Sequence, residues 1–359
     1  MPVPSIAVLL SGGVDSAVAL KLLQETHPQA QIHACYLKIW LEDELAYLGE
    51  CPWEEDLSYV RSICEQCDVP LEIVNLQAEY LSRVVDFSLA ELKAGRTPSP
   101  DIHCNERIKF GAFLEKVGRQ FDFVASGHYA QTKISADGKV HLVRAPDAIK
   151  DQSYFLSNLS QDQLQKILFP IGHLPKSEVR RLAEFYDLPP KHRKDSQGIC
   201  FLGKIPYREF VRFHLGEKLG EVVEIETQKV LGTHQGSWFH TIGQRKGLGL
   251  GQGPWFVVDK DFEKNIVYVS HHDHYLELAR DRFELLDIHW ILGQAPQQES
   301  FHFKLRHGPH LTRGQLLSSP IGPTMVLLEE TDPGIASGQH AVIYHEDECL
   351  GGGVIRLIK

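Results

Sequence analysis

Apolar and polar positions alternate in two different ways along this chain. Up to about residue 205, short apolar runs are separated by stretches in which apolar residues recur with helical spacing. Strands that alternate with helices indicate an α/β fold built on a doubly wound parallel sheet. The predicted strands are Ile6–Leu10, Ile32–Ile39, Leu71–Leu76 and Phe121–Ser126, and the predicted helices lie near 15–25, 55–68, 79–95, 106–119, 161–168 and 176–186.

Beyond about residue 215 the pattern changes to short β-type runs bounded by Gly, Pro and Asp, which is typical of small antiparallel barrels. These runs are Glu221–Ile225, Trp255–Val258, Ile266–Val269, His302–Leu305, Met325–Leu328 and Ala341–Tyr344. We therefore predict three domains, which are an α/β domain over 1–210, a small β-rich central domain over 211–277 and a C-terminal antiparallel β-barrel over 278–359.

A turn of small residues follows the first predicted strand and precedes an apolar helical stretch. Adjacent glycines let backbone N–H groups approach an anion, the serines add hydroxyl donors, and a helix N-terminus favours negative charge. The spacing is neither that of a Walker loop nor that of a dinucleotide-binding turn. We predict a phosphate site formed by Leu9, Leu10, Ser11, Gly12, Gly13, Val14, Asp15 and Ser16.

Composition narrows the class of protein. The 359 residues are 43% hydrophobic and 23% charged, which is ordinary for a globular protein. No apolar run is long enough to span a bilayer, and the N-terminus has no basic signal region, so we expect a cytoplasmic enzyme without a membrane partner. The net charge of −10 argues against nonspecific coating of nucleic acid. Local basic runs, such as Lys176 with Arg180-Arg181, are first interpreted as solvated faces.

Two cysteines lie in polar settings that suit reactive thiols. Cys104 follows two prolines and precedes a predicted helix over 106–116, whose dipole would favour the thiolate, and Asp101 stands close by as a possible acid or base. Cys200 lies in a polar loop beside the basic run 191–194. Two such thiols suit sulfur transfer, although a buried packing role is common for cysteine and the sequence does not show whether the two meet.

Three other groups are interpreted as structural. Cys64 and Cys67 have the spacing of half a zinc site, but no second pair follows. His271-His272-Asp273-His274 is expected to be a surface turn, because consecutive residues on a turn seldom converge on one ion. Cys349 is expected to pack in the interior, and no metal site is predicted.

The turn over 11–16 resembles the loop of the PP-loop ATP pyrophosphatases, and the chain as a whole resembles the bacterial tRNA-specific 2-thiouridylases. The resemblance covers nearly the full length. It is carried by Ser11–Ser16, Leu37-Lys38-Ile39-Trp40, Pro100–Asn105, Gly127-His128-Tyr129-Ala130, Lys150–Leu156, Asp195–Phe201, Thr241–Gly247 and Gly351–Ile355.

This resemblance implies a two-stage reaction on tRNA. ATP, with Mg²⁺, would bind Leu9–Ser16 with Leu37 and Gly127 near the adenosine, and would adenylate the C2 oxygen of the wobble uridine at position 34. Cys200 would carry a persulfide from a sulfur donor, either a cysteine desulfurase or a sulfur-relay protein. Its sulfur would attack C2, and Cys104 would resolve the persulfide and leave a disulfide, with Asp101 as acid or base.

The same resemblance implies the RNA contacts, with the tRNAs for Lys, Glu and Gln as substrates. The implied contacts are Ser99, Pro100, Asp101, His128, Lys150, Asp151, Gln152, Arg306, His307 and Gln339. Three positions depart from the family pattern, since Ser99 replaces an Asn, Leu37 replaces a Met, and His307 stands where an aromatic is usual.

Three alternatives remain open from the sequence. A different PP-loop enzyme, which amidates a nucleotide or attaches an amino acid to tRNA, would use the loop but not two cysteines. A non-catalytic RNA-binding protein would explain the β-rich half and the basic runs. A thiol-disulfide oxidoreductase would explain the cysteines but has no use for a phosphate loop.

Overall fold

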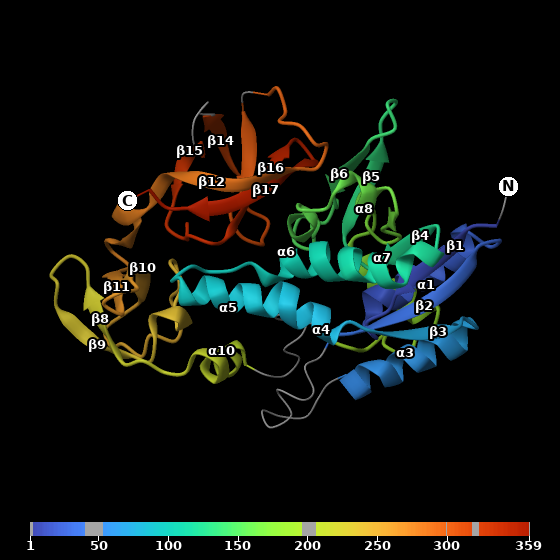
Figure 1. Cartoon of the computed structure of the whole chain (residues 1–359), viewed down its shortest axis with the longest axis horizontal. Helices are drawn as coiled ribbons and strands as arrows, with labels where there is room; N and C mark the ends of the chain where they lie inside the picture. The colour runs from blue at the N-terminus through green and yellow to red at the C-terminus, as the bar shows by residue number, and fades with distance from the viewer. Residues whose placement is uncertain (1–2, 40–52, 196–205, 299, 318–322, 359) are drawn as a thin grey trace.

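The computed structural model describes residues 3–39, 53–195, 206–298, 300–317 and 323–358. The N-terminal part contains a five-stranded parallel sheet with strand order β3-β2-β1-β4-β7 (Figure 1). The strands are β1 (Ser5–Leu9), β2 (Gln31–Lys38), β3 (Leu71–Asn75), β4 (Phe123–Ser126) and β7 (Ile167–Leu168). The predicted doubly wound α/β fold is confirmed.

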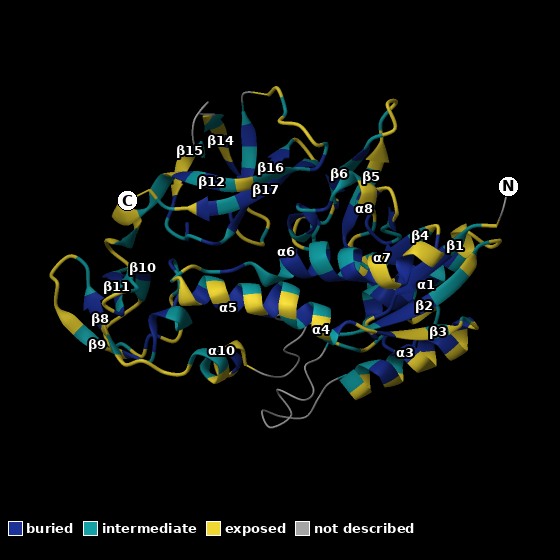
Figure 2. Ribbon diagram, viewed as in Figure 1, coloured by how far each residue is buried: buried dark blue, intermediate teal, exposed yellow. Residues whose placement is uncertain are grey.

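Helices cover both faces of this sheet. Ile6 and Val8 of β1 pack in one hydrophobic cluster with α1 (Val14–Thr26), α3 (Trp53–Cys67) and α9 (Lys176–Phe185). Ala7 and Leu9 belong to a second cluster with α5 (Asp86–Lys93), α6 (Pro100–Cys104) and α7 (Phe113–Lys116). Figure 2 shows the centre of this layered region as mostly buried. Because β1 is covered on both sides, its sequence is a continuous apolar run.

Two predicted helices differ from the observed ones. The helix expected over 106–119 begins at Pro100, as α6, and continues through a π-helix over Asn105–Ala112 into α7. Proline is well tolerated at the first helical position, where its missing N–H would have no helical partner. The helix expected over 161–168 ends at Leu164, as α8 (Gln161–Leu164), and the next apolar pair forms β7 instead.

The central part has α10 (Tyr207–Leu215) followed by a four-stranded sheet of order β10-β11-β8-β9. Its strands are β8 (Gly220–Glu224), β9 (Val230–His234), β10 (Trp255–Asp261) and β11 (Ile266–His271). The predicted small β-rich central domain is confirmed, but β8 and β11 run parallel, so its sheet is mixed and lacks the all-antiparallel pairing that short β-type runs favour. The strand sequences alone do not specify which neighbours pair.

The C-terminal part is a closed antiparallel barrel, as predicted. β12 (Arg280–Trp290) pairs with both β15 (Thr324–Asp332) and β17 (Glu348–Arg356), and β14 (Thr312–Leu317), β13 (Phe301–Lys304) and β16 (His340–His345) complete the circuit. Glycine is required where β17 crosses β12, because a Cβ at Gly351 would lie 2.0 Å from the His289 carbonyl oxygen.

A hairpin from the N-terminal half joins the barrel sheet. β5 (Ala130–Ile134) and β6 (Val140–Arg144) follow β4 in the chain, and β6 pairs with β17 at Val143–Glu348 and Leu142–Cys349. A fully buried ion pair, with Lys304 Nζ 2.8 Å from Asp151 Oδ2, joins β13 to the turn after β6. The barrel is therefore held directly against the domain that carries the phosphate loop.

Candidate functional site

The small-residue turn lies between β1 and α1, at the carboxyl end of the central strands. Gly12 has φ of +75°, and a Cβ there would lie 2.6 Å from the Asp56 carbonyl oxygen, so the turn requires glycine. The Ser11 backbone N–H donates to Ser16 Oγ at 3.2 Å, and that hydroxyl donates to the Gly13 carbonyl at 3.1 Å. The serine hydroxyls thus hold the loop shape that presents its N–H groups to an anion.

Residues after β4 complete this loop from the neighbouring strand. Gly127 packs so closely that a Cβ would lie 2.8 Å from the Ser16 amide nitrogen. Tyr129 donates its hydroxyl to Asp15 Oδ1 at 2.8 Å, which orients the carboxylate beside the loop. Leu37 is half-buried near the carboxyl end of β2. The structure therefore brings the predicted nucleotide residues to one edge of the sheet, where doubly wound folds bind ligands.

A cluster of cations surrounds the loop. Lys176 Nζ lies 2.6 Å from Asp15 Oδ1 and 2.8 Å from Asp195 Oδ1, so one ammonium bridges two carboxylates. Asp195 also pairs with Arg180 and, at 2.7 Å, with Lys150 Nζ. Although burial alone would raise it, the two lysines hold the pKa of the Asp195 carboxyl well below its usual range. Three cations thus gather beside the loop, and such a concentration of positive side chains suits a polyanionic ligand.

The cluster was not predicted as a site, because Lys176 and Arg180 were interpreted as a solvated face. One sequence signal was available, since Pro175 marks the start of a helix and so places Lys176 in its first turn. In the structure this helix, α9, packs against α1, which follows the phosphate loop. Arg193 adds a fourth cation, donating to the Gly12 carbonyl at 3.0 Å and pairing with Asp56. Distance in the sequence hid these contacts.

Asp101 and Cys104 lie one turn apart on α6. Cys104 is buried, at 2% exposed, and Asp101 is half-buried. Burial raises the pKa of the Asp101 carboxyl, and Lys109 opposes this shift. A carboxyl whose pKa is raised can both hold and release a proton closer to neutral pH. Cys104 does not stand at the helix start as predicted, so the helix dipole acts on it less strongly than expected.

The charge of Lys109, which lies in the π-helix after α6, acts on Asp101 and also on His128, just after β4. Burial, with the Lys109 ammonium as a second cause, lowers the pKa of His128 well below its ordinary value, so this imidazole is neutral at neutral pH. His128 Nδ1 is 2.9 Å from Ser126 Oγ, and the residue is 9% exposed. Lys109 therefore influences both His128 and Asp101, a role that the sequence reading missed.

Three comparisons place the chain among known proteins. It is 46% identical to "tRNA-specific 2-thiouridylase MnmA 1" of Bacteroides thetaiotaomicron over 357 residues, which is 98% of this chain and 99% of the relative. It is 47% identical to the MnmA 2-thiouridylase of Parabacteroides distasonis, and 46% identical to that of Porphyromonas gingivalis, over 98% of both chains in each case. The chain belongs to the tRNA-specific 2-thiouridylase family.

Family models match the same 2-thiouridylase chain in three consecutive pieces. They are described as "tRNA methyl transferase HUP domain" over 4–204, "tRNA methyl transferase PRC-barrel domain" over 208–271 and "Aminomethyltransferase beta-barrel domain" over 280–355. These descriptions name methyl or aminomethyl transfer, whereas the full-length relatives are named for thiolation. The full-length similarity decides the family.

Of the RNA contacts expected in this 2-thiouridylase around residue 150, Asp151 lies inside the fold, whereas Lys150 and Gln152 are half-buried. Asp151 is 1% exposed, and Gln152 Oε1 accepts the Tyr129 backbone N–H at 3.0 Å. Lys150 reaches Asp195, as described above. A side-chain contact between Asp151 and RNA would require its pair with Lys304 to open.

The remaining expected contacts lie toward the barrel. Arg306 binds Asp332 with both terminal nitrogens, at 2.8 and 2.9 Å, and is half-exposed. His307 stacks on Phe155, with ring centroids 4.7 Å apart. Gln339 precedes β16, and the His340 backbone N–H donates to Ser99 Oγ at 3.3 Å. Ser99, which immediately precedes Pro100 of α6, thus connects the start of that helix to the barrel.

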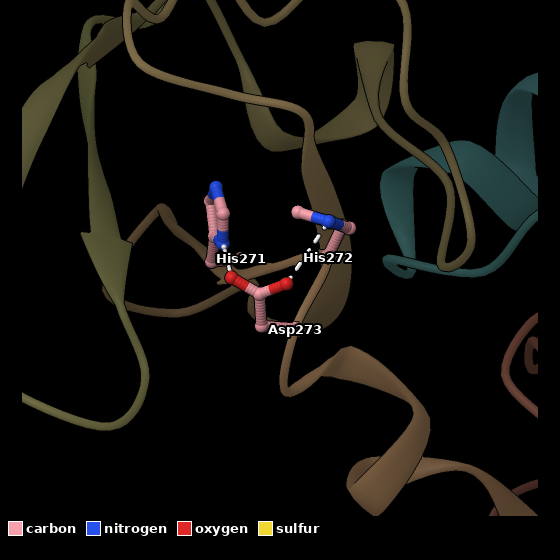
Figure 3. Close-up of side chains that lie close together, drawn as sticks. All are labelled: His271, His272 and Asp273. Carbon is pink, nitrogen blue, oxygen red and sulfur yellow. Dashed lines mark hydrogen bonds and ion pairs between the residues drawn. The ribbon is translucent and has the colours of Figure 1, made fainter.

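The turn at the end of β11 brings three polar side chains together. His271 Nδ1 and His272 Nε2 each lie 2.9 Å from a different oxygen of Asp273, and the ligand atoms of the three residues lie within 4.8 Å of one another (Figure 3). These contacts are made within the turn, and the expectation that its residues share no metal ion stays a prediction. His272 and Asp273 are exposed, whereas His271 is half-buried.

Several cysteine expectations have different outcomes. Burial is the main cause that raises the pKa of Cys64 to about 11 and that also raises the pKa of Cys67, which suits the structural role predicted for them. Cys349 is buried in the shared core, as expected. Cys200, and with it the implied disulfide to Cys104, lies outside the described residues.

Within the described ranges, no helix has the length and apolar character needed to cross a bilayer.

Proposed function

We propose that this chain is a tRNA-uridine 2-sulfurtransferase, which uses ATP to replace the C2 oxygen of the wobble uridine by sulfur. The observation that carries the proposal is the 46–47% identity to named tRNA-specific 2-thiouridylases over 98% of the chain. The loop, the cation cluster and the paired Asp101 and Cys104 supply residues for each stage of that reaction.

In the first stage the uracil C2 oxygen attacks the α-phosphorus of ATP, and pyrophosphate leaves. The N–H groups of the loop would hold the phosphates, while Lys176 and Arg180 would receive the negative charge that develops on the leaving pyrophosphate. The residues present fit a triphosphate, because the turn requires glycine at Gly12 and the side chains of Lys176 and Arg180 gather beside it. Mg²⁺ would accompany ATP and neutralise part of its charge.

In the second stage a persulfide on Cys200 delivers sulfur. Its terminal sulfur attacks C2, and AMP departs with the original oxygen. Adenylation makes this possible, because the carbonyl oxygen alone is a poor leaving group and AMP is a good one. The Cys104 thiolate then attacks the Cys200 Sγ and breaks the sulfur–sulfur bond, which leaves 2-thiouridine and a Cys104–Cys200 disulfide. Asp101 would accept or donate the proton that moves with these steps. A thiol reductant would restore both cysteines.

The substrate is proposed to be a tRNA whose anticodon presents an unstacked wobble uridine, since enzymes that modify a base must reach it outside the helical stack. The expected recognition residues Arg306, His307 and Gln339 belong to the barrel, and Ser99 and Pro100 belong to the segment that enters α6. The phosphate loop, the catalytic helix and the barrel would therefore act on one bound anticodon loop.

The direct test is incubation with unmodified tRNA carrying a wobble uridine, Mg²⁺-ATP and a persulfide donor, followed by nucleoside mass spectrometry. We expect a 2-thiouridine peak that requires both ATP and the donor, with pyrophosphate released in step. Pyrophosphate release without 2-thiouridine would indicate another adenylating PP-loop enzyme. The absence of any tRNA-stimulated pyrophosphate release would indicate an RNA-binding protein instead.

Opposite effects on ATP are expected from two neighbours in the cation cluster. Lys176→Gln should lower kcat/KM for ATP about 100-fold, because a cation aimed at the phosphates is lost. Asp195→Asn should instead tighten ATP binding, since it removes a carboxylate that competes with the phosphates for Lys176 and Arg180. Equilibrium dialysis with labelled ATP measures binding, and pyrophosphate release measures turnover.

Lys133→Gln is the matched control, because Lys133 is an exposed lysine on β5 of the same domain. It should leave ATP binding unchanged. If Asp195→Asn weakened ATP binding as much as Lys176→Gln does, the cluster would be a structural network and not a phosphate site.

A further inference from the structure

A short strap, residues 95–99, connects α5 to the helix that carries Asp101 and Cys104. In Figure 1 it returns from the far end of α5 to α6 along the underside of the barrel. The strap ends at Ser99, and α6 begins at the next residue. Any shift of the strap therefore moves the start of the catalytic helix.

The barrel grips the strap through the loop before β16. The Thr97 backbone N–H donates to the Ser337 carbonyl at 2.8 Å, and the His340 N–H donates to Ser99 Oγ. Gly338 is packed against the strap, so that a Cβ there would lie 2.8 Å from Arg96 Cβ and 2.9 Å from the Thr97 nitrogen and oxygen. The loop itself is tied to β17, because Gly338 N–H donates to the Ile355 carbonyl at 2.9 Å.

The central domain reaches the same strap from another side. A Cβ at Gly95 would lie 3.0 Å from Phe262, which follows β10. The Thr97 and Thr241 hydroxyl oxygens are 3.3 Å apart, and Thr241 begins the segment 241–247. Both β-rich parts of the molecule therefore contact the few residues that immediately precede the catalytic helix.

A buried contact continues this docking onto α6 itself. His103 of α6 packs edge-on against His340 of β16, with ring centroids 5.3 Å apart, and against Phe87 of α5 at 4.5 Å. The Tyr154 hydroxyl donates to the His340 carbonyl at 3.1 Å. The barrel strand thus touches the strap and the catalytic helix at neighbouring positions.

We propose that the strap is a positioning element through which the two β-rich domains set Asp101 and Cys104 for reaction, with Thr97 and Gly338 as its positioning residues. The proposal rests on the proposed function. Gln339, an expected RNA contact, lies between Gly338 and His340. Binding of RNA at Gln339 and placement of the catalytic helix would therefore be coupled, because the adjacent residue Gly338 packs against the strap.

Gly338→Ala tests the strap, with Gly138→Ala as its control. Both glycines have positive φ, +92° and +80°, so alanine strains the backbone at either position, but nothing lies within 4 Å of a Cβ at Gly138. We expect Gly338→Ala to lower kcat for 2-thiouridine formation about 10- to 100-fold with the KM for ATP unchanged, because small misplacements of reacting groups are expensive. Its melting temperature should fall further than that of Gly138→Ala, because the added Cβ displaces the strap, and kcat is therefore compared at a temperature where both variants are folded.

Thr97→Val supplies a second test if Gly338→Ala does not fold. Valine keeps the shape of threonine but removes the hydroxyl that faces Thr241, and should lower kcat about three- to tenfold. Thr97→Ser keeps the hydroxyl and should restore the rate. Equal kcat values in Gly338→Ala and Gly138→Ala, or equal losses in both Thr97 variants, would overturn the proposal.

Hydrogen–deuterium exchange separates failure of the strap from failure of the proposed function. The Thr97 amide should exchange faster in Gly338→Ala than in Gly138→Ala, whatever reaction the enzyme performs. Unchanged exchange would overturn the strap. Faster exchange in a chain whose wild type forms no 2-thiouridine would overturn the proposed function, and with it the reaction that the strap is proposed to serve.

Discussion

Alanine at Cys104 or at Cys200 is expected to abolish 2-thiouridine formation, by more than about 1,000-fold, while pyrophosphate is still released. Activation of the C2 oxygen uses the phosphate loop and its cations, and neither thiol takes part in it. Delivery of sulfur needs one thiol to carry the persulfide and the other to break it. Nucleoside mass spectrometry and a single-turnover pyrophosphate assay on the same reaction measure the two stages separately.

The double variant sharpens this prediction. The effects of mutating residues that serve one reaction step do not add. The double variant Cys104→Ala/Cys200→Ala should therefore form 2-thiouridine no more slowly than either single variant. Cys67→Ala is the matched control, because Cys67 is buried to a similar degree, 6% exposed against 2% for Cys104, but lies on α3 in the other hydrophobic cluster. Full thiolation by either single variant would exclude the two-cysteine reaction.

The features that could be predicted from local sequence are those in which each residue's partner is near in the chain or is implied by the regular spacing of apolar residues. Alternation of apolar runs with helical stretches was sufficient for the parallel sheet, because β1 and β2 are joined by one helix and every residue of β1 pairs with β2. The turn at Gly12-Gly13 was visible because positive φ and close backbone approach leave few residue choices. The closed barrel followed from regularly spaced short strands.

The features that escaped prediction depend on partners far away in the sequence. The strand over 140–144 pairs with β17, about 200 residues later, and no local pattern specifies that partner. Asp151 looked like an accessible polar residue, yet Lys304 neutralises it in the core. Lys176 looked like part of a solvated run until Asp15 and Asp195 were found on either side of it. Charge along a chain indicates that a partner is needed and does not say where it lies.

Removal of Lys304 is expected to lower the free energy of unfolding by about 3–5 kcal/mol, because it leaves an uncompensated carboxylate in the core. The Lys304 and Asp151 side chains are both fully buried, and Lys304 lies 5.4 Å from the Tyr344 ring centroid. Arg144, with Nε 3.3 Å from the same carboxylate, should keep the loss toward the lower end for Lys304→Met. Chemical denaturation at pH 7 measures the loss, and Lys133→Met, at an exposed position, should change stability by less than about 0.5 kcal/mol.

The pH dependence gives an independent check on this pair. Burial alone would raise the pKa of Asp151, but Lys304 and the hydrogen bonds from Ser153 outweigh it and lower the pKa. A carboxyl whose folded pKa is lowered contributes stability above its unfolded pKa of about 3.9, and loses it as the pH falls toward the folded value. Loss of Lys304 removes the main opposing cause and leaves burial to raise the pKa of Asp151. The stability gap between wild type and Lys304→Met should therefore narrow as the pH falls from the variant's Asp151 pKa toward the lower wild-type pKa. Lys304→Met with Asp151→Leu should recover most of the stability, since apolar replacement of a buried pair is often neutral. A single variant as stable as the wild type would show that Arg144 alone neutralises Asp151 and that Lys304 does not join the barrel to the N-terminal domain energetically.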